Sequence, residues 1–96
     1  MTDPNQKSLG EAIALLLKTY QLEDKFEQAR LIQSWESVVG SMIARHTTDL
    51  YIQKKTLFVY IDSDALRHEL SFARGQIIQN LNQAAGKEVI DEIVFR

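Results

Sequence analysis

Residues 46–61, HTTDLYIQKKTLFVYI, decide the fold that this sequence predicts. After His46 the apolar residues alternate with polar or aromatic ones at period two, which is typical of β-strands. Two such runs flank Lys54 and Lys55, so we predict a β-hairpin with the lysine pair in its turn. The turn lacks an Asn-Gly signal, and its geometry stays open.

The alternation divides the hairpin side chains between two faces. One face carries aliphatic residues, which we expect helices to cover: Leu50, Ile52, Leu57, Val59 and Ile61. The other face carries three aromatic residues: Tyr51, Phe58 and Tyr60. These aromatics are candidates for a protein interface or for stacking on unpaired bases. The alternatives are that strands simply favour aromatics, or that the amino-terminal helix covers them.

The residues before the hairpin predict two helices. Ser8 followed by Glu11 is a capping box, so the first helix begins there and runs to about Tyr20. An apolar stripe at helical spacing predicts a second helix over about 24–45, passing through Gly40. A glycine inside a helix costs roughly 1 kcal/mol relative to alanine. We therefore expect another backbone to approach closely there.

The residues after the hairpin predict a helix and a last strand. Ser63 is a good N-cap, and Gly86 is a natural helix stop. A strand over 89–95 follows, with Ile93 and Phe95 inward. The order α-α-β-β-α-β predicts an α+β fold, in which helices pack on one face of a three-stranded sheet. The last strand follows a helical crossover and can run parallel to a hairpin strand.

Composition limits the classes of function. The 96 residues are enough for one domain, which we place over residues 8–96 after a disordered lead-in over 1–7. Cysteine is absent, which excludes disulfides and thiolate nucleophiles. The polar first residues and the lack of a long apolar run lead us to expect a cytoplasmic protein without a membrane segment. No catalytic or cofactor motif is present, so we expect neither an enzyme nor a cofactor.

The charged residues predict at most weak nucleic-acid binding. Residues 41–96 carry seven basic and seven acidic residues, whereas dedicated nucleic-acid binders have a basic excess. The candidate phosphate contacts are Arg45, Lys54, Lys55, Arg67 and Arg74. Solubility is the alternative explanation of these residues. His46 is expected to cap the second helix, and the two histidines have no metal-site spacing.

A run of residues before the hairpin resembles a known family. The pattern Trp35-x-x-Val38-Val39-Gly40-x-x-Ile43-Ala44-x-His46-Thr47 is similar to a signature of the DciA-like family, bacterial proteins linked to loading the replicative helicase. Leu57-x-Val59, Glu69-Leu70 and Ile93-x-Phe95-Arg96 extend the resemblance over about residues 8–96. It implies a KH-like topology, with Trp35, Gly40 and His46 as the structural motif. The GxxG phosphate clamp of true KH domains is absent from the sequence.

The resemblance also implies a function. It points to a non-enzymatic accessory module of bacterial DNA replication that binds the replicative helicase and weakly contacts single-stranded or tailed DNA. The alternative is a general protein-interaction domain with no nucleic-acid role. Self-association into a homo-oligomer is left open. We expect Trp35, which lies on an apolar helical stripe, to anchor the core rather than to contact a partner.

Overall fold

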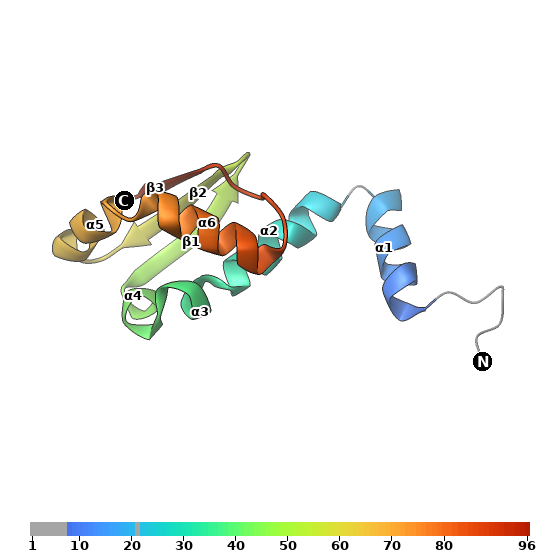
Figure 1. Cartoon of the computed structure of the whole chain (residues 1–96), viewed down its shortest axis with the longest axis horizontal. Helices are drawn as coiled ribbons and strands as arrows, with labels where there is room; N and C mark the ends of the chain where they lie inside the picture. Colours follow the sequence, from blue (N-terminus) through green and yellow to red (C-terminus); the bar gives the residue numbers. More distant parts are fainter. Residues whose placement is uncertain (1–7, 21) are drawn as a thin grey trace.

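The computed structural model describes residues 8–20 and 22–96. The expected lead-in over 1–7 lies outside these residues. The described elements follow one another along the chain as shown in Figure 1: α1 (Leu9–Thr19), α2 (Glu23–Gln33), α3 (Trp35–Val39), α4 (Ser41–Arg45), β1 (Thr47–Gln53), β2 (Thr56–Ile61), α5 (Asp64–Ser71), α6 (Arg74–Ala85) and β3 (Glu92–Phe95). The predicted α+β class is therefore confirmed.

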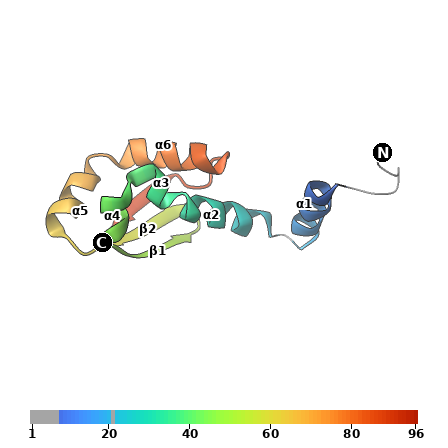
Figure 2. The same cartoon turned by 90° about the horizontal axis from the view of Figure 1, so that it is seen from below.

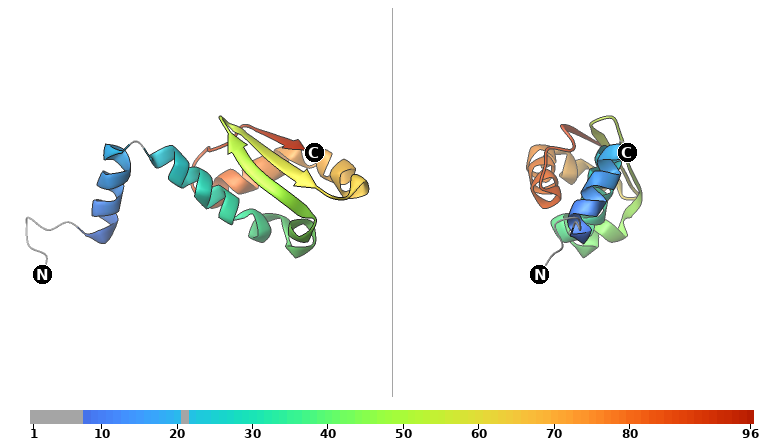
Figure 3. Two further views of the ribbon diagram at one scale, coloured as in Figure 1. Left: turned by 180° about the vertical axis from the view of Figure 1, so that it is seen from behind. Right: turned by 90° about the vertical axis from the view of Figure 1, so that its right-hand side faces the viewer.

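The sheet has the order β1-β2-β3, with the hairpin partner β2 in the centre. β1 and β2 are antiparallel, as the alternation predicted, and β3 runs parallel to β2 after the helical crossover. Helices α2, α3 and α6 lie on one side of the sheet (Figure 2). Seen from behind, the hairpin lies in front of α6, and none of the helices formed by residues 8–20 and 22–96 covers this face (Figure 3, left).

The core lies between the sheet and these helices. The aliphatic residues of β2 and β3 are almost completely buried, as the alternation predicted: Leu57, Val59, Ile61 and Ile93. They pack with residues of the covering helices and of the segment before β3: Leu31, Trp35, Leu70, Ile77, Leu81, Ala85 and Ile90. Burying each of these larger aliphatic side chains contributes about 1.5–3 kcal/mol.

The single helix predicted over 24–45 is wrong, because three helices occupy this segment. α2 ends before Ser34, and Gly40 separates α3 from α4. Gly40 has φ 93° and ψ 163°, a conformation that is essentially restricted to glycine. A Cβ at this position would meet no atom within 4 Å, so the expected close backbone approach is also wrong. The backbone turn, rather than packing, requires this glycine.

The helix predicted after the hairpin begins and ends where expected but is broken in the middle. The Ser63 hydroxyl accepts a hydrogen bond from the Leu66 N–H at 3.2 Å, which confirms the N-cap. Gly86 has φ 79° and ends α6, as predicted. Phe72 and Ala73 separate α5 from α6. Arg67 and Arg74 therefore lie on two helices rather than on one face of a single helix.

The last strand is shorter than predicted because a side chain takes the place of strand pairing in its first residues. The Asn82 amide oxygen accepts hydrogen bonds from the N–H groups of Val89 and Ile90 at 2.9 and 3.1 Å. Its amide nitrogen donates to the Ile90 carbonyl at 2.8 Å. Asn82 therefore fixes the loop between α6 and β3, and strand pairing begins only at Glu92.

Helix α1 begins as predicted but lies away from the sheet. The Ser8 hydroxyl accepts a hydrogen bond from the Glu11 N–H at 3.1 Å. Both Figure 1 and Figure 2 show α1 beyond the far end of α2, apart from both faces of the sheet. The alternative that the amino-terminal helix covers the hairpin aromatics is therefore wrong. None of the described helices is long and apolar enough to cross a membrane.

We predict that Gly40→Ala destabilises the fold by about 1–3 kcal/mol, because alanine is strained at this φ and ψ. Gly75 is the matched control, since it is the second residue of α6, has no positive φ, and an added Cβ there would meet nothing within 4 Å. Gly75→Ala should raise stability by roughly 0.4–1 kcal/mol. Urea titration measures both changes, and equal effects of the two substitutions would contradict this account of Gly40.

Candidate functional site

A β-bulge at the start of β1 brings the family-like motif together. Thr47 pairs with Ile61 and Asp49 pairs with Tyr60, so Thr48 is an extra residue in β1. This extra residue places Thr47 on the same face as the buried Ile61, toward the helices. Without the bulge, Thr47 would share the open face with Asp49 and Tyr51.

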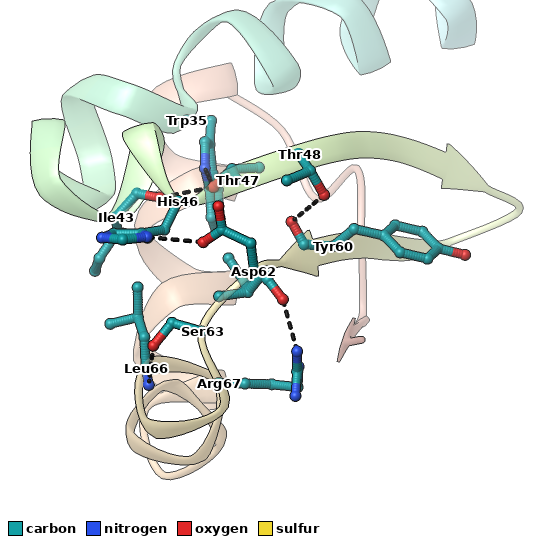
Figure 4. Close-up of polar contacts among 11 residues, drawn as sticks. Trp35, Ile43, His46, Thr47, Thr48, Tyr60, Asp62, Ser63, Leu66 and Arg67 are labelled. Carbon is teal, nitrogen blue, oxygen red and sulfur yellow. Dashed lines mark hydrogen bonds and ion pairs between the residues drawn. The ribbon is translucent and has the colours of Figure 1, made fainter.

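Thr47 connects Trp35 to the end of α4. The Trp35 indole Nε1 donates to the Thr47 hydroxyl at 3.0 Å, and that hydroxyl donates to the Ile43 carbonyl at 2.8 Å (Figure 4). Trp35 is 4% exposed, so its ring is a core group, as the sequence indicated. The hydrogen bond satisfies its one polar atom, as a buried indole requires.

His46 ends α4, where we expected it, and also contacts the loop after β2. Its Nδ1 lies 2.7 Å from Asp62 Oδ1, and its carbonyl accepts from the Asp62 N–H at 3.0 Å. Both side chains are about half exposed, so this contact adds little stability by itself. The described residues include no cluster of three or more acidic or histidine side chains that could hold a metal ion.

The three aromatic residues of the hairpin form a stacked cluster on the open face of the sheet. Tyr51 lies opposite Phe58 in the β1–β2 pairing, and their ring centroids are 5.0 Å apart at an interplanar angle of 18°. Tyr51 also stacks on Tyr60, with centroids 6.1 Å apart. Phe58 in turn pairs with Val94 of β3, so the apolar surface continues across all three strands.

Arg96 borders this aromatic cluster and was not among the sequence candidates. Its guanidinium carbon lies 5.1 Å from the Phe58 ring centroid, within the range of a cation–π contact. The pKa of Tyr60 is lowered, first by its hydrogen bond with Tyr51 and then by its hydrogen bond with Arg96. The same Tyr51–Tyr60 hydrogen bond raises the pKa of Tyr51. The parallel pairing of β3 with β2 places Arg96 here. The sequence predicted a parallel last strand, but it did not predict which hairpin strand that strand pairs with or in which register.

The five candidate basic residues do not converge. Lys54 and Lys55 form the hairpin turn at one end of β1, where Lys54 has a positive φ of 58°. Arg45 precedes the other end of β1, roughly 20 Å away for a seven-residue strand. Arg67 and Arg74 lie beyond β2 and line a hollow of about 390 Å³ with His68 and Phe95. A single basic patch is therefore not formed.

Arg67 is engaged in the fold. Its Nη2 donates to the Ile61 carbonyl at 2.7 Å, and its Nη1 lies 2.5 Å from Asp64 Oδ1. The Arg67 side chain is 32% exposed, whereas Asp64 is 97% exposed. The hydrogen bond to the Ile61 carbonyl connects α5 to the end of β2. It leaves only part of the Arg67 guanidinium free to contact a ligand.

Lys54 and Lys55 line a second hollow of about 280 Å³ at the hairpin tip. Lys87 adds a third positive charge, and three carboxylates surround them: Asp24, Glu27 and Glu88. These carboxylates offset the positive potential of the lysines, which weakens attraction for phosphate groups.

Comparison with known proteins identifies relatives of the chain. Residues 8–95 match the family model described as "Dna[CI] antecedent, DciA". A protein of Corynebacterium glutamicum (strain R), named "UPF0232 protein", is 37% identical over 60 residues. The matched segment covers 62% of the present chain and 34% of that relative, so the chain spans about a third of the relative's length.

We predict that Arg67→Ala lowers stability by about 1–3 kcal/mol, because the Ile61 carbonyl loses a charged hydrogen-bond donor. Arg74→Ala is the matched control. Arg74 is exposed, and its Nε donates a local hydrogen bond to the Ser71 carbonyl at 3.2 Å. The control should change stability by less than about 0.5 kcal/mol. Thermal and urea unfolding of both variants test the difference, and two equal values would refute the structural role of Arg67.

Proposed function

The chain belongs to the DciA family, and on this basis we propose that it is a non-enzymatic accessory module of bacterial DNA replication that binds the replicative helicase. The family indicates the role in replication. We further propose that the helicase contacts the open face of the sheet, and that nucleic acid is contacted weakly.

The aromatic cluster is the observation that carries this proposal. Tyr51, Phe58 and Tyr60 are only partly buried, and no described helix covers them. Aromatic residues and arginine are enriched in protein interfaces, where they are also the commonest hot spots. Stacked rings beside Arg96 offer a rigid contact surface that loses little conformational entropy on binding.

The charges around the cluster favour a protein partner over a nucleic acid. Asp49 pairs with Tyr60 and lies on the same face, where it repels phosphates. Of the basic residues discussed, Arg96 is the one beside the rings, and the candidate lysines lie at the hairpin tip. A strand of nucleic acid that stacks on aromatics normally follows a positively charged groove.

The separation of the basic residues also supports the second candidate function, a protein-interaction domain with no nucleic-acid role. Capture of the helicase from lysate, with and without nuclease, compares the two functions. Capture that survives nuclease treatment supports direct helicase binding. Capture that requires nucleic acid would contradict the proposed protein contact.

We predict that Phe58→Ser weakens helicase binding by at least about thirtyfold, the effect of losing a hot spot worth about 2 kcal/mol. Phe58 points away from the core, so the fold should remain largely intact. Titration of the purified helicase with labelled chain measures the affinity, and circular dichroism checks folding.

The matched control for this experiment is Phe72→Ser. Phe72 is 77% exposed and lies between α5 and α6, outside the aromatic cluster. This variant should bind the helicase normally. An unfolded Phe58→Ser chain, or equal loss of binding in both variants, would show that the open face is not the specific contact surface.

We predict that the affinity for single-stranded DNA is weak and falls about tenfold between roughly 50 and 200 mM salt, as for two or three phosphate contacts. Lys54 and Lys55 are exposed at the hairpin tip and form no ion pair within residues 8–20 and 22–96. Replacing both with alanine should reduce the salt slope by about 1–2. Fluorescence anisotropy measures the slope, and tight binding at the higher salt concentration would contradict the prediction.

A further inference from the structure

Helix α1 is apolar on nearly all sides, yet none of its residues is buried. Six consecutive apolar residues, 12–17, lie between Glu11 and Lys18 and therefore surround the helix axis. A helix with this composition is normally buried against other elements. In this chain α1 lies beyond the end of α2, with both its ends away from the core (Figures 1 and 2). Its apolar surface therefore requires a partner.

The exposed apolar surface continues from α1 into the first turn of α2. Its large side chains are between 42% and 78% exposed: Leu9, Ile13, Leu15, Leu16, Tyr20, Leu22 and Phe26. Seven such side chains, each about half exposed, present on the order of 700 Å². Monomers rarely expose continuous apolar patches of this size, whereas a standard interface uses about 800 Å² from each partner.

The apolar surface formed by α1 and the start of α2 has both a ridge and a groove. The ridge consists of Leu9, Leu16 and Tyr20, which lie seven and four residues apart on one side of α1. The groove, of about 410 Å³, lies between α1 and α2. Its apolar lining includes Ile13, Leu17 and Phe26, and its charged lining residues are Glu23, Glu27 and Lys87. In a two-fold dimer, the ridge of each copy can enter the groove of the other, so that both are filled at once.

We propose that a second copy of this chain occupies this surface, so that two copies associate through α1 and the start of α2. The area matches what a dimer interface needs, and the ridge and groove are self-complementary in a two-fold arrangement. The proposal is independent of helicase binding, because the aromatic cluster lies on the sheet, away from α1 (Figure 3).

The mass of the purified chain in solution tests this proposal. Sedimentation equilibrium should give twice the chain mass of 11.0 kDa at micromolar concentration. The double variant Leu9→Ser, Leu16→Ser should weaken dimerisation at least about tenfold, because two buried leucines are lost from each copy. Neither residue belongs to the core, so circular dichroism should show an intact sheet domain. Phe72→Ser is the control for loss of an exposed apolar side chain elsewhere, and it should remain dimeric.

Cross-linking tests the proposed geometry, because the natural chain contains no cysteine. A mass-tagged Leu16→Cys chain is mixed with a Phe26→Cys chain and treated with a short bismaleimide. A cross-linked pair carrying one tag is expected, since Leu16 is in the ridge and Phe26 lines the groove. Replacing the Phe26→Cys chain with a Phe72→Cys chain should abolish the product.

Three results would overturn the proposal. The first is a monomeric chain at all concentrations, and the second is a dimer whose mass is unchanged by the double variant. The third is a monomer that loses helicase capture when Leu9 and Leu16 are replaced, which would assign α1 to the helicase instead. Failure of the Phe58→Ser prediction alone leaves the dimer proposal intact, because the dimer experiments contain no helicase.

Discussion

The hydrogen-bond chain from Trp35 through Thr47 to Ile43 is the constraint on which the rest of the structure depends. It joins α3, α4 and the first residue of β1 through hydrogen bonds of 3.0 and 2.8 Å. Thr47 reaches Trp35 only because the bulge at Thr48 turns it toward the helices. The register of the hairpin and the packing of the helices are therefore linked, and this register places the aliphatic residues inward and the aromatic residues outward.

The motif that resembles the family therefore acts as a scaffold. Trp35 is buried, Gly40 makes the turn between two short helices, and His46 connects α4 to the loop after β2. None of these residues reaches the aromatic cluster. A family signature of this kind identifies the fold, whereas other residues form the candidate contact surface.

The described part of the chain has an apolar surface on the sheet and another on α1 and the start of α2, both outside the core. The aromatic cluster lies on β1 and β2, with Val94 of β3 beside Phe58, and is bordered by Arg96 and Asp49. The surface of α1 and the start of α2 is a ridge beside a groove. Their separation means that the proposed helicase contact and the proposed dimer contact use different surfaces. The candidate basic residues lie at opposite ends of the sheet, so they form no single basic patch.

The sequence by itself determined the features that depend on local geometry. Period-two alternation predicted the hairpin and both of its faces, and side-chain and backbone preferences predicted the caps at Ser8, Ser63 and Gly86. Tertiary structure alone decided the helix break at Gly40 and the bulge at Thr48. It also placed Arg96 beside Phe58 and paired the Arg67 guanidinium with the Ile61 carbonyl. The physical reason is that an apolar stripe continues through a helix break without interruption. Contacts between distant strands and helices, which no short segment encodes, decide where the chain turns and which residues meet.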